Sequence, residues 1–195
     1  VGLMEQISHL YKNEYEKLVQ NAEALNEGIA TQNLDFLNDK HSEISGYEDF
    51  YETMHNRIDE QFGGLTGAPK FPMPSVWDFL LQYSYLTGSE SAYDNTMFTL
   101  ERIALSGTYD QLGGGFARYA TDMNWKIPHF EKMLYDNGQL ISTYSNAYKT
   151  EHYEVFKDIV YQTVDFIERE LMNDKFGFYS SLNADSEGEE GKFYV

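Results

Sequence analysis

The chain contains no cysteine among its 195 residues. Disulfide bonds, thiolate catalysis and Cys-ligated zinc sites are therefore excluded. Basic residues are few as well, because 14 Lys and Arg stand against 32 Asp and Glu, and the formal net charge is −18. Such a field repels phosphate backbones and anionic lipid headgroups. We therefore expect neither a nucleic-acid partner nor a membrane partner.

Long apolar runs are missing too. No window approaches the roughly 18 uninterrupted apolar residues of a transmembrane helix. The first residues, VGLMEQISHLYKNEYEK, lack the cationic lead and the apolar block of a signal peptide, so we expect a cytoplasmic protein. The composition, with 42% hydrophobic and 16% aromatic residues, is sufficient for one sizeable core. The length predicts one domain over residues 1–195, although a chain that begins with Val leaves open that it belongs to something longer.

The spacing of apolar residues indicates a helical protein. They recur at three- and four-residue steps, which is the pattern of amphipathic helices. Pro74 and Gly88 delimit one helix, and Ser89 is a plausible N-cap for the next. We expect six helices, over residues 4–29, 47–58, 74–87, 89–106, 130–148 and 151–172, the fifth of them beginning near Pro128.

Turns that combine glycine with an aromatic residue follow the ends of helices at FGGLTG, LGGGF and FGFYSS, which contain Phe62, Leu112 and Phe176. Their separations each accommodate two helices with connections, which predicts repeated helical hairpins. The last stretch, residues 175–195, alternates aromatic and polar residues and predicts short extended segments around an acidic turn. Loops on a rigid scaffold commonly carry function, so we expect the site on the face where these loops gather.

Some longer runs resemble the signature runs of one family. They are GAPKFP (67–72), GGGFARYATDMNW (113–125), PHFEKMLYDNGQL (128–140) and DSEGEEGKFYV (185–195). The chain resembles the helical portion of the YyaL-type, spermatogenesis-associated, thioredoxin-domain-containing proteins. The resemblance implies an all-α fold of helical hairpin repeats that form about half of an (α/α)6 toroid, with short β segments in the loops. Toroids of this six-hairpin glycosidase kind are related in shape to N-acylglucosamine 2-epimerases.

The resemblance also carries functional expectations. It implies a carbohydrate-active domain, epimerase- or isomerase-like or glycosidase-like, that acts on a small-molecule sugar. We expect no cofactor and no metal. The alternative is a non-catalytic scaffold that binds a partner or a thioredoxin-like domain, which this chain does not contain. Ala117 stands where the family's GGGFxRY run is expected to hold His, so a role for that His is lost or was never essential. Half a toroid leaves apolar helix faces open, so we expect self-association.

The candidate catalytic residues are titratable groups near the glycine-rich turns. His129 suits acid-base chemistry near neutral pH, although it also fits a purely structural place at a helix start. On a helix that begins near Pro128, Asp136 lies about 20° from His129 and orients it through an intermediary, or pairs with Arg118. Asp185 and Glu187 belong to a crowded acidic run, which raises a carboxyl pKa for acid catalysis, collects a hard cation or is a solvated turn.

The candidate substrate-binding residues are cationic and aromatic. Arg118 and Tyr119 follow three glycines, so Arg118 either clamps a ligand or ties its loop to a helix. Tyr119 and Trp125 offer flat surfaces on which a sugar can stack, with core packing as the alternative. Lys70, between Pro69 and Phe71, either approaches a ligand or fixes its loop by hydrogen bonds.

Overall fold

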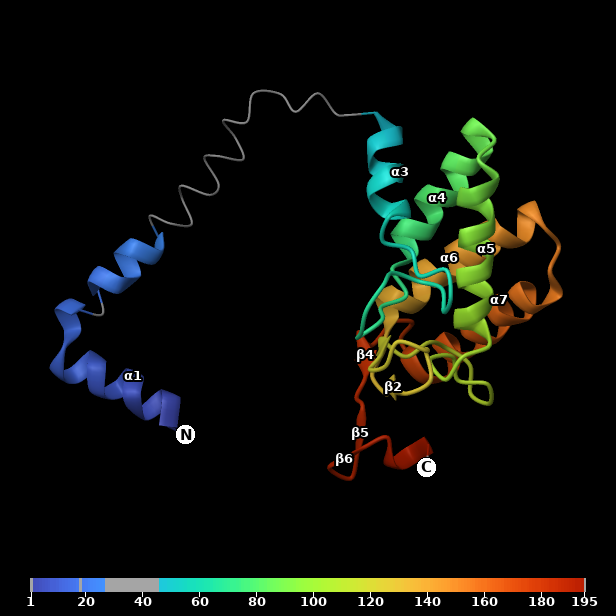
Figure 1. Ribbon diagram of the computed structural model, residues 1–195. Helices are drawn as coiled ribbons and strands as arrows, with labels where there is room; N and C mark the ends of the chain where they lie inside the picture. Colours follow the sequence, from blue (N-terminus) through green and yellow to red (C-terminus); the bar gives the residue numbers. More distant parts are fainter. Residues whose placement is uncertain (1, 18, 27–45, 195) are drawn as a thin grey trace. The chain divides into compact units, whose positions relative to one another are not determined.

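The computed structural model describes residues 2–17, 19–26 and 46–194, and the chain divides into two compact units, Val1–Gly46 and Tyr47–Val195 (Figure 1). The prediction of one domain over the whole chain stays a prediction. In the first unit, α1 spans Gly2–Asn13, and residues 15–17 and 19–26 are also helical. The expected first helix is therefore interrupted at Glu14, where a charged residue breaks the apolar stripe. Its predicted end, 27–29, lies outside the described residues.

The second unit is built mainly from helices, most of which the sequence predicts. Pro74 begins α4, and Gly88 ends it with a left-handed φ of 75° while donating its N–H to Ser84. The Oγ of Ser89 accepts a hydrogen bond from the N–H of Ala92, which confirms the expected N-cap of the following helix. The helices are α3 (Tyr47–His55), α4 (Pro74–Thr87), α5 (Glu90–Ala104), α6 (Leu134–Thr150), α7 (Glu154–Phe166) and the π-helical turn η1 (Ile167–Leu171).

Two helical hairpins, α4 with α5 and α6 with α7, share one core (Figure 1). Their inward faces bury large side chains completely, and the Tyr144 hydroxyl donates to the carbonyl of Leu100 at 2.8 Å. Within the described segments, no helix combines the length and the apolar character needed to cross a membrane. The largest fully buried side chains of this core are Trp77, Leu80, Leu100, Ile103, Phe116, Trp125, Leu140, Tyr144 and Phe156.

Short antiparallel strand pairs connect the loops below the helices (Figure 1). Their presence confirms the short β segments expected in the loops. The described part of the chain ends in a 3-10 turn, Lys192–Tyr194, so the extended conformation expected at Phe193 is wrong. The pairs are β1 (Tyr119–Ala120) with β2 (Pro128–His129), β3 (Lys132–Met133) with β4 (Ser181–Leu182), and β5 (Asp185–Ser186) with β6 (Glu189–Glu190).

The start of α6 differs from the prediction. The helix begins at Leu134 rather than near Pro128, because the preceding residues pair with other loop segments. The carbonyl of Glu131 accepts a hydrogen bond from the N–H of Arg118, and the N–H of Leu134 donates to Ser180. These partners satisfy backbone groups that a longer helix would otherwise pair internally. His129 is therefore not on the helix, and the calculated angle between His129 and Asp136 does not apply.

The loop after α3 has a tightly hydrogen-bonded frame. Asp59 Oδ1 accepts the N–H groups of the second and third residues after it, and the Asp59 N–H donates to the carbonyl of Gly64 at 2.9 Å. Gly63 and Gly64 have left-handed φ angles of 73° and 77°. Lys70 Nζ then reaches back to Asp59 Oδ2 at 2.7 Å and to the carbonyl of Gly63 at 2.6 Å.

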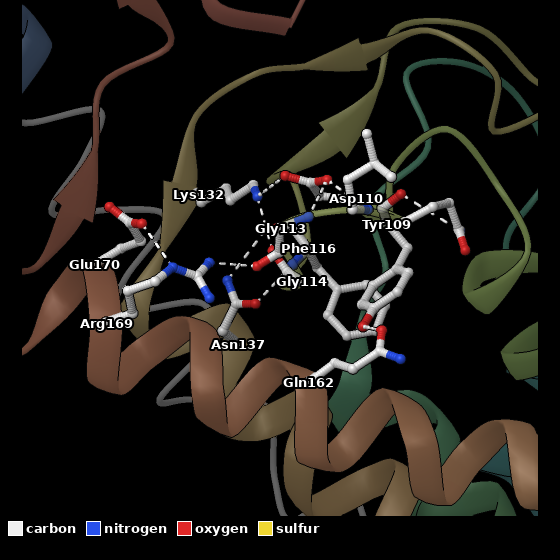
Figure 2. Close-up of polar contacts among 12 residues, drawn as sticks. Tyr109, Asp110, Gly113, Gly114, Phe116, Lys132, Asn137, Gln162, Arg169 and Glu170 are labelled. Carbon is white, nitrogen blue, oxygen red and sulfur yellow. Dashed lines mark hydrogen bonds and ion pairs between the residues drawn. The ribbon is translucent and has the colours of Figure 1, made fainter.

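The loop after α5 repeats this frame (Figure 2). Asp110 Oδ1 accepts the N–H groups of the second and third residues after it, and the Asp110 N–H donates to the carbonyl of Gly115 at 3.0 Å. Gly114 and Gly115 have φ angles of 76° and 82°. Lys132 Nζ donates to Asp110 Oδ2 and to the carbonyl of Gly114, both at 2.8 Å. The matching bonds show that the first two of the three glycine-rich turns are structural repeats, although Lys70 and Lys132 lie at different distances along the chain from Asp59 and Asp110.

Candidate functional site

An aromatic shelf lies where β1 pairs with β2. Tyr119 stands opposite His129 in the strand register, and the two rings stack with centroids 4.8 Å apart and planes at 17°. Phe71 lies against Tyr119 with a centroid distance of 4.8 Å, and 41% of Phe71 is exposed. We call Phe71, Tyr119 and His129 the aromatic shelf. It presents flat rings and one titratable imidazole to solvent.

Two carboxylates flank the imidazole of His129. Glu190 Oε1 lies 2.7 Å from Nδ1, while Glu131 Oε2 lies 3.8 Å from Nε2. Glu131 Oε2 also accepts a hydrogen bond from Arg118 Nη1 at 3.0 Å. The structure therefore brings His129 and Arg118 together through Glu131. This ion pair also raises the pKa of the Arg118 guanidinium, chiefly through its hydrogen bond to Glu131.

Asp136 belongs electrostatically to the same cluster. It stands in the first turn of α6, and burial raises the pKa of its carboxyl to about 6. The positive charge of Arg118 lowers this pKa and the negative charge of Glu131 raises it. Asp136 Oδ2 is buried without a hydrogen-bond partner among the described residues. The expected Arg118–Asp136 pair does not form, because Glu131 accepts from the guanidinium instead.

Lys70 and Trp125 lie outside this cluster. Lys70 is only 2% exposed, and the hydrogen bonds of its ammonium hold the loop frame, including one to the carbonyl of Leu65 at 3.0 Å. Trp125 is 1% exposed, and its Nε1 donates to the carbonyl of Phe62 at 3.1 Å. Its ring also lies against Gly64. Lys70 therefore fixes its loop and Trp125 packs in the core, which are the structural alternatives given for them in the sequence analysis.

Asp185 and Glu187 lie on the hairpin formed by β5 and β6, and neither forms a hydrogen bond or an ion pair with the imidazole. Glu187 forms an ion pair with Lys192 at 2.7 Å, and Asp185 is exposed opposite Glu190 in the strand register. The member of the acidic run that reaches His129 is Glu190. The candidate site is therefore the aromatic shelf together with Arg118, Glu131, Asp136 and Glu190.

Glu131 and Glu190 are the members of the site that sequence reasoning missed. Alternate residues of an extended segment point to the same side, so Glu131 shares a side with His129 once residues 128–133 are extended rather than helical. Nothing in the acidic run distinguishes Glu190 from its neighbours, because the strand register selects it. Within the part of the chain that the structure describes, no three His, Asp or Glu side chains are arranged to hold a metal ion.

The fold matches solved structures of carbohydrate-active proteins. A sugar epimerase from a ruminal bacterium superposes with a TM-score of 0.62 at 18% identity, over 72% of this chain and 38% of that one. An unsaturated glucuronyl hydrolase specific for heparin superposes with a TM-score of 0.59 at 10% identity, over 77% of this chain and 45% of that one. The matched part of the chain thus has the fold of part of an (α/α)6 toroid, which confirms the predicted fold class.

The sequence comparison identifies a relative. Human spermatogenesis-associated protein 20 is 39% identical over 155 residues, which cover 74% of this chain and 20% of that protein. No protein-family model matches. The chain is therefore homologous to a segment of spermatogenesis-associated protein 20, and the resemblance seen in the sequence is confirmed. The chain spans about a fifth of the length of this human relative.

Proposed function

We propose that the chain is a carbohydrate-active domain of the epimerase or isomerase class, in which His129 moves a proton next to a sugar carbonyl. The observation that carries the proposal is the placement of a partly exposed imidazole on the aromatic shelf, joined to Arg118 through Glu131. The likeness of the fold to a sugar epimerase supports it. The name of the human relative specifies no reaction.

The proposed step needs only groups that the chain supplies. The imidazole of His129 accepts the proton from the carbon beside the carbonyl, and the electron pair of the broken C–H bond moves onto the carbonyl oxygen. Arg118 stabilises the resulting oxyanion, because the guanidinium has five N–H donors and Glu131 accepts from Nη1. When the enediolate rotates about the next C–C bond and presents its other face to the same imidazole, return of the proton to the original carbon gives the epimer. Return of the proton to the neighbouring carbon, with transfer of the substrate's own hydroxyl proton to the oxyanion, gives the isomer.

The aromatic shelf supplies the binding surface. Sugar rings have apolar C–H faces, and these pack on the flat rings of Phe71 and Tyr119. Since the imidazole of His129 stacks on Tyr119, a sugar bound beside that ring brings its C–H groups close to the imidazole edge. The shelf thus orients a substrate, which is a large part of what such a reaction requires.

A glycosidase-like variant of this proposal uses Asp136 instead. A carboxyl with a pKa of about 6 is suited to act as a general acid, and Glu131 is the carboxylate whose charge acts on it. Retaining and inverting glycosidases both use such a carboxyl pair. The solved glucuronyl hydrolase shares the fold, so this variant belongs to the same assay.

The test is proton exchange measured by ¹H NMR. The chain is incubated in D2O with a panel of mono- and disaccharides, and we expect loss of the C2–H signal of at least one of them. His129→Gln should abolish the exchange, whereas His152→Gln, which changes an exposed histidine near Tyr148, should leave it intact. Cleavage of a disaccharide that Asp136→Asn abolishes would favour the glycosidase variant.

If no sugar exchanges a proton, is cleaved or raises the melting temperature, the carbohydrate proposal is wrong. A rise in melting temperature on addition of a thioredoxin-like domain would then favour the scaffold alternative.

A further inference from the structure

We propose that Glu190 is a positioning residue for His129, because its carboxylate holds a proton on Nδ1 and leaves Nε2 as the atom that accepts a proton. The catalytic consequence rests on the proposed function. The protonation pattern of the imidazole does not, and it is measurable without a ligand.

The distances around the imidazole assign the role of each nitrogen. A carboxylate only accepts hydrogen bonds, so the 2.7 Å contact between Glu190 Oε1 and Nδ1 places an N–H on Nδ1. Glu131 Oε2 is 3.8 Å from Nε2, which is too long for a hydrogen bond, and this oxygen already accepts from Arg118 Nη1. A neutral imidazole with a proton on Nδ1 has its lone pair on Nε2.

The ring orientation is fixed independently. Stacking on Tyr119 sets the plane of the imidazole, and pairing of β1 with β2 sets its position along the strand. A 180° flip of the ring about the last side-chain bond keeps this plane and is therefore the remaining freedom of His129, and the hydrogen bond between Nδ1 and Glu190 selects one of the two orientations. A histidine held by a partner at one nitrogen presents the other in a defined direction.

The hairpin carries Glu190 to this position by backbone geometry. Glu190 pairs with Asp185 across β5 and β6, and the next residue, Gly191, donates its N–H to the carbonyl of Ala184 at 3.0 Å. Gly191 has a φ of 72° and lies against the ring of Phe130, so a side chain there would collide with that ring. Phe130 is adjacent to His129, and this close approach seats the hairpin beside the imidazole.

The two carboxylates also match the charge that develops during the proposed step. When Nε2 accepts a proton the imidazole becomes positive, and Glu131 and Glu190 lie beside its two nitrogens. Asp136 and Arg118 are the other charged groups of the site, and Arg118 is paired with Glu131. Glu190 can accept from the Nδ1–H both before and after Nε2 takes up the proton, and it fixes the reactive form of the neutral ring.

The experiment is long-range ¹H–¹⁵N NMR of the protein with ¹⁵N-labelled histidine at pH 8, where the protonated and unprotonated ring nitrogens have distinct shifts. We expect His129 to carry its proton on Nδ1 in the unchanged chain. Glu190→Ala should move the population toward the Nε2–H form. Glu190→Gln should retain the Nδ1–H form, because the amide oxygen can still accept. Glu189→Ala, a change at the neighbouring exposed residue of the same strand, should alter nothing.

An Nε2–H form in the unchanged chain, or an unaltered Nδ1–H form in Glu190→Ala, would overturn the proposal. If an exchanging sugar is found, Glu190→Ala should lower kcat roughly 10- to 100-fold with little change in KM, as expected for an orienting partner. Proton exchange of a sugar together with an Nε2–H form of His129 would reject only the role of Glu190. The right tautomer without a sugar substrate would reject only the proposed function.

Discussion

Lys132 and Asp110 form a largely buried ion pair, with Nζ 2.8 Å from Oδ2, that fastens β3 to the glycine loop (Figure 2). The ammonium also lies 4.6 Å from the centroid of the Phe166 ring. Successive side chains of an extended segment point to opposite sides, so an inward Lys132 directs Glu131 outward toward Arg118. The ion pair therefore contributes to the geometry of the candidate site as well as to the fold.

We expect Lys132→Met to lower the free energy of unfolding by roughly 3 kcal/mol, because it leaves the Asp110 carboxylate without its cation in a largely buried place. Lys175→Met, at an exposed residue, should change the free energy of unfolding by less than about 0.5 kcal/mol. Urea denaturation followed by circular dichroism measures both values. Equal stability of the two variants would show that the pair contributes little.

Gly115, in the loop after α5, and Gly188, in the turn between β5 and β6, form a matched pair for a test of glycine, because both have a φ of 82°. A Cβ at Gly115 would collide with the Phe166 ring, whereas a Cβ at Gly188 would meet no atom within 4 Å. Gly188→Ala should therefore cost only backbone strain, about 1 kcal/mol, while Gly115→Ala adds a steric clash of about 1–3 kcal/mol. The comparison requires only the two unfolding midpoints. Similar midpoints would mean that Phe166 moves aside at little cost.

The helices could be predicted from the sequence because their signals are local. Pro74, Gly88 and Ser89 act through their own backbone geometry and capping bonds, and each lies where the sequence placed it. The repeated glycine turns were also visible as a pattern. The ion pairs that tie these turns were not visible, because Lys70 and Asp59 are separated along the chain by a different number of residues than Lys132 and Asp110.

The site was predicted only in part, and the error has one cause. Residues 128–133 have an apolar spacing that suits a helix, but pairing with β1 and β4 overrides that preference. As a result Glu131 was not recognised as the link between His129 and Arg118. The choice of Glu190 over Asp185 and Glu187 depends on the register of a hairpin, and one shifted residue would present a different carboxylate.

Asp136 should make stability depend on pH in an unusual direction. Its pKa is about 6 in the folded chain because of burial, above the ordinary 3.8 of the unfolded chain, so the folded chain binds more protons between these values. The contribution of this carboxyl to stability is therefore lost as the pH rises from about 4 to 6 and stays constant above that range.

Asp136→Asn should remove this dependence. Relative to the unchanged chain, the variant should therefore gain more stability at pH 7 than at pH 4. Asp174→Asn, at an exposed residue, provides the control for charge removal. The measurement is the difference in unfolding free energy between each variant and the unchanged chain at pH 4, 5, 6 and 7. A difference for Asp136→Asn that is flat across this range would contradict the raised pKa.

Arg118 and Glu131 should shift the pKa of Asp136 in opposite directions. The guanidinium favours the charged carboxylate and the neighbouring Glu131 disfavours it, so Arg118→Met should raise the pKa above about 6 and Glu131→Gln should lower it. Carboxyl ¹³C NMR titration of Asp136 reads both changes directly, and Arg57→Met, at an exposed arginine, should leave the titration unaltered. No shift in either variant would mean that burial alone controls the pKa of Asp136, and shifts of the same sign would contradict the opposing effects of the two charges. Opposite shifts would show that the carboxyl responds to both charges of the pair, as the proposed site requires.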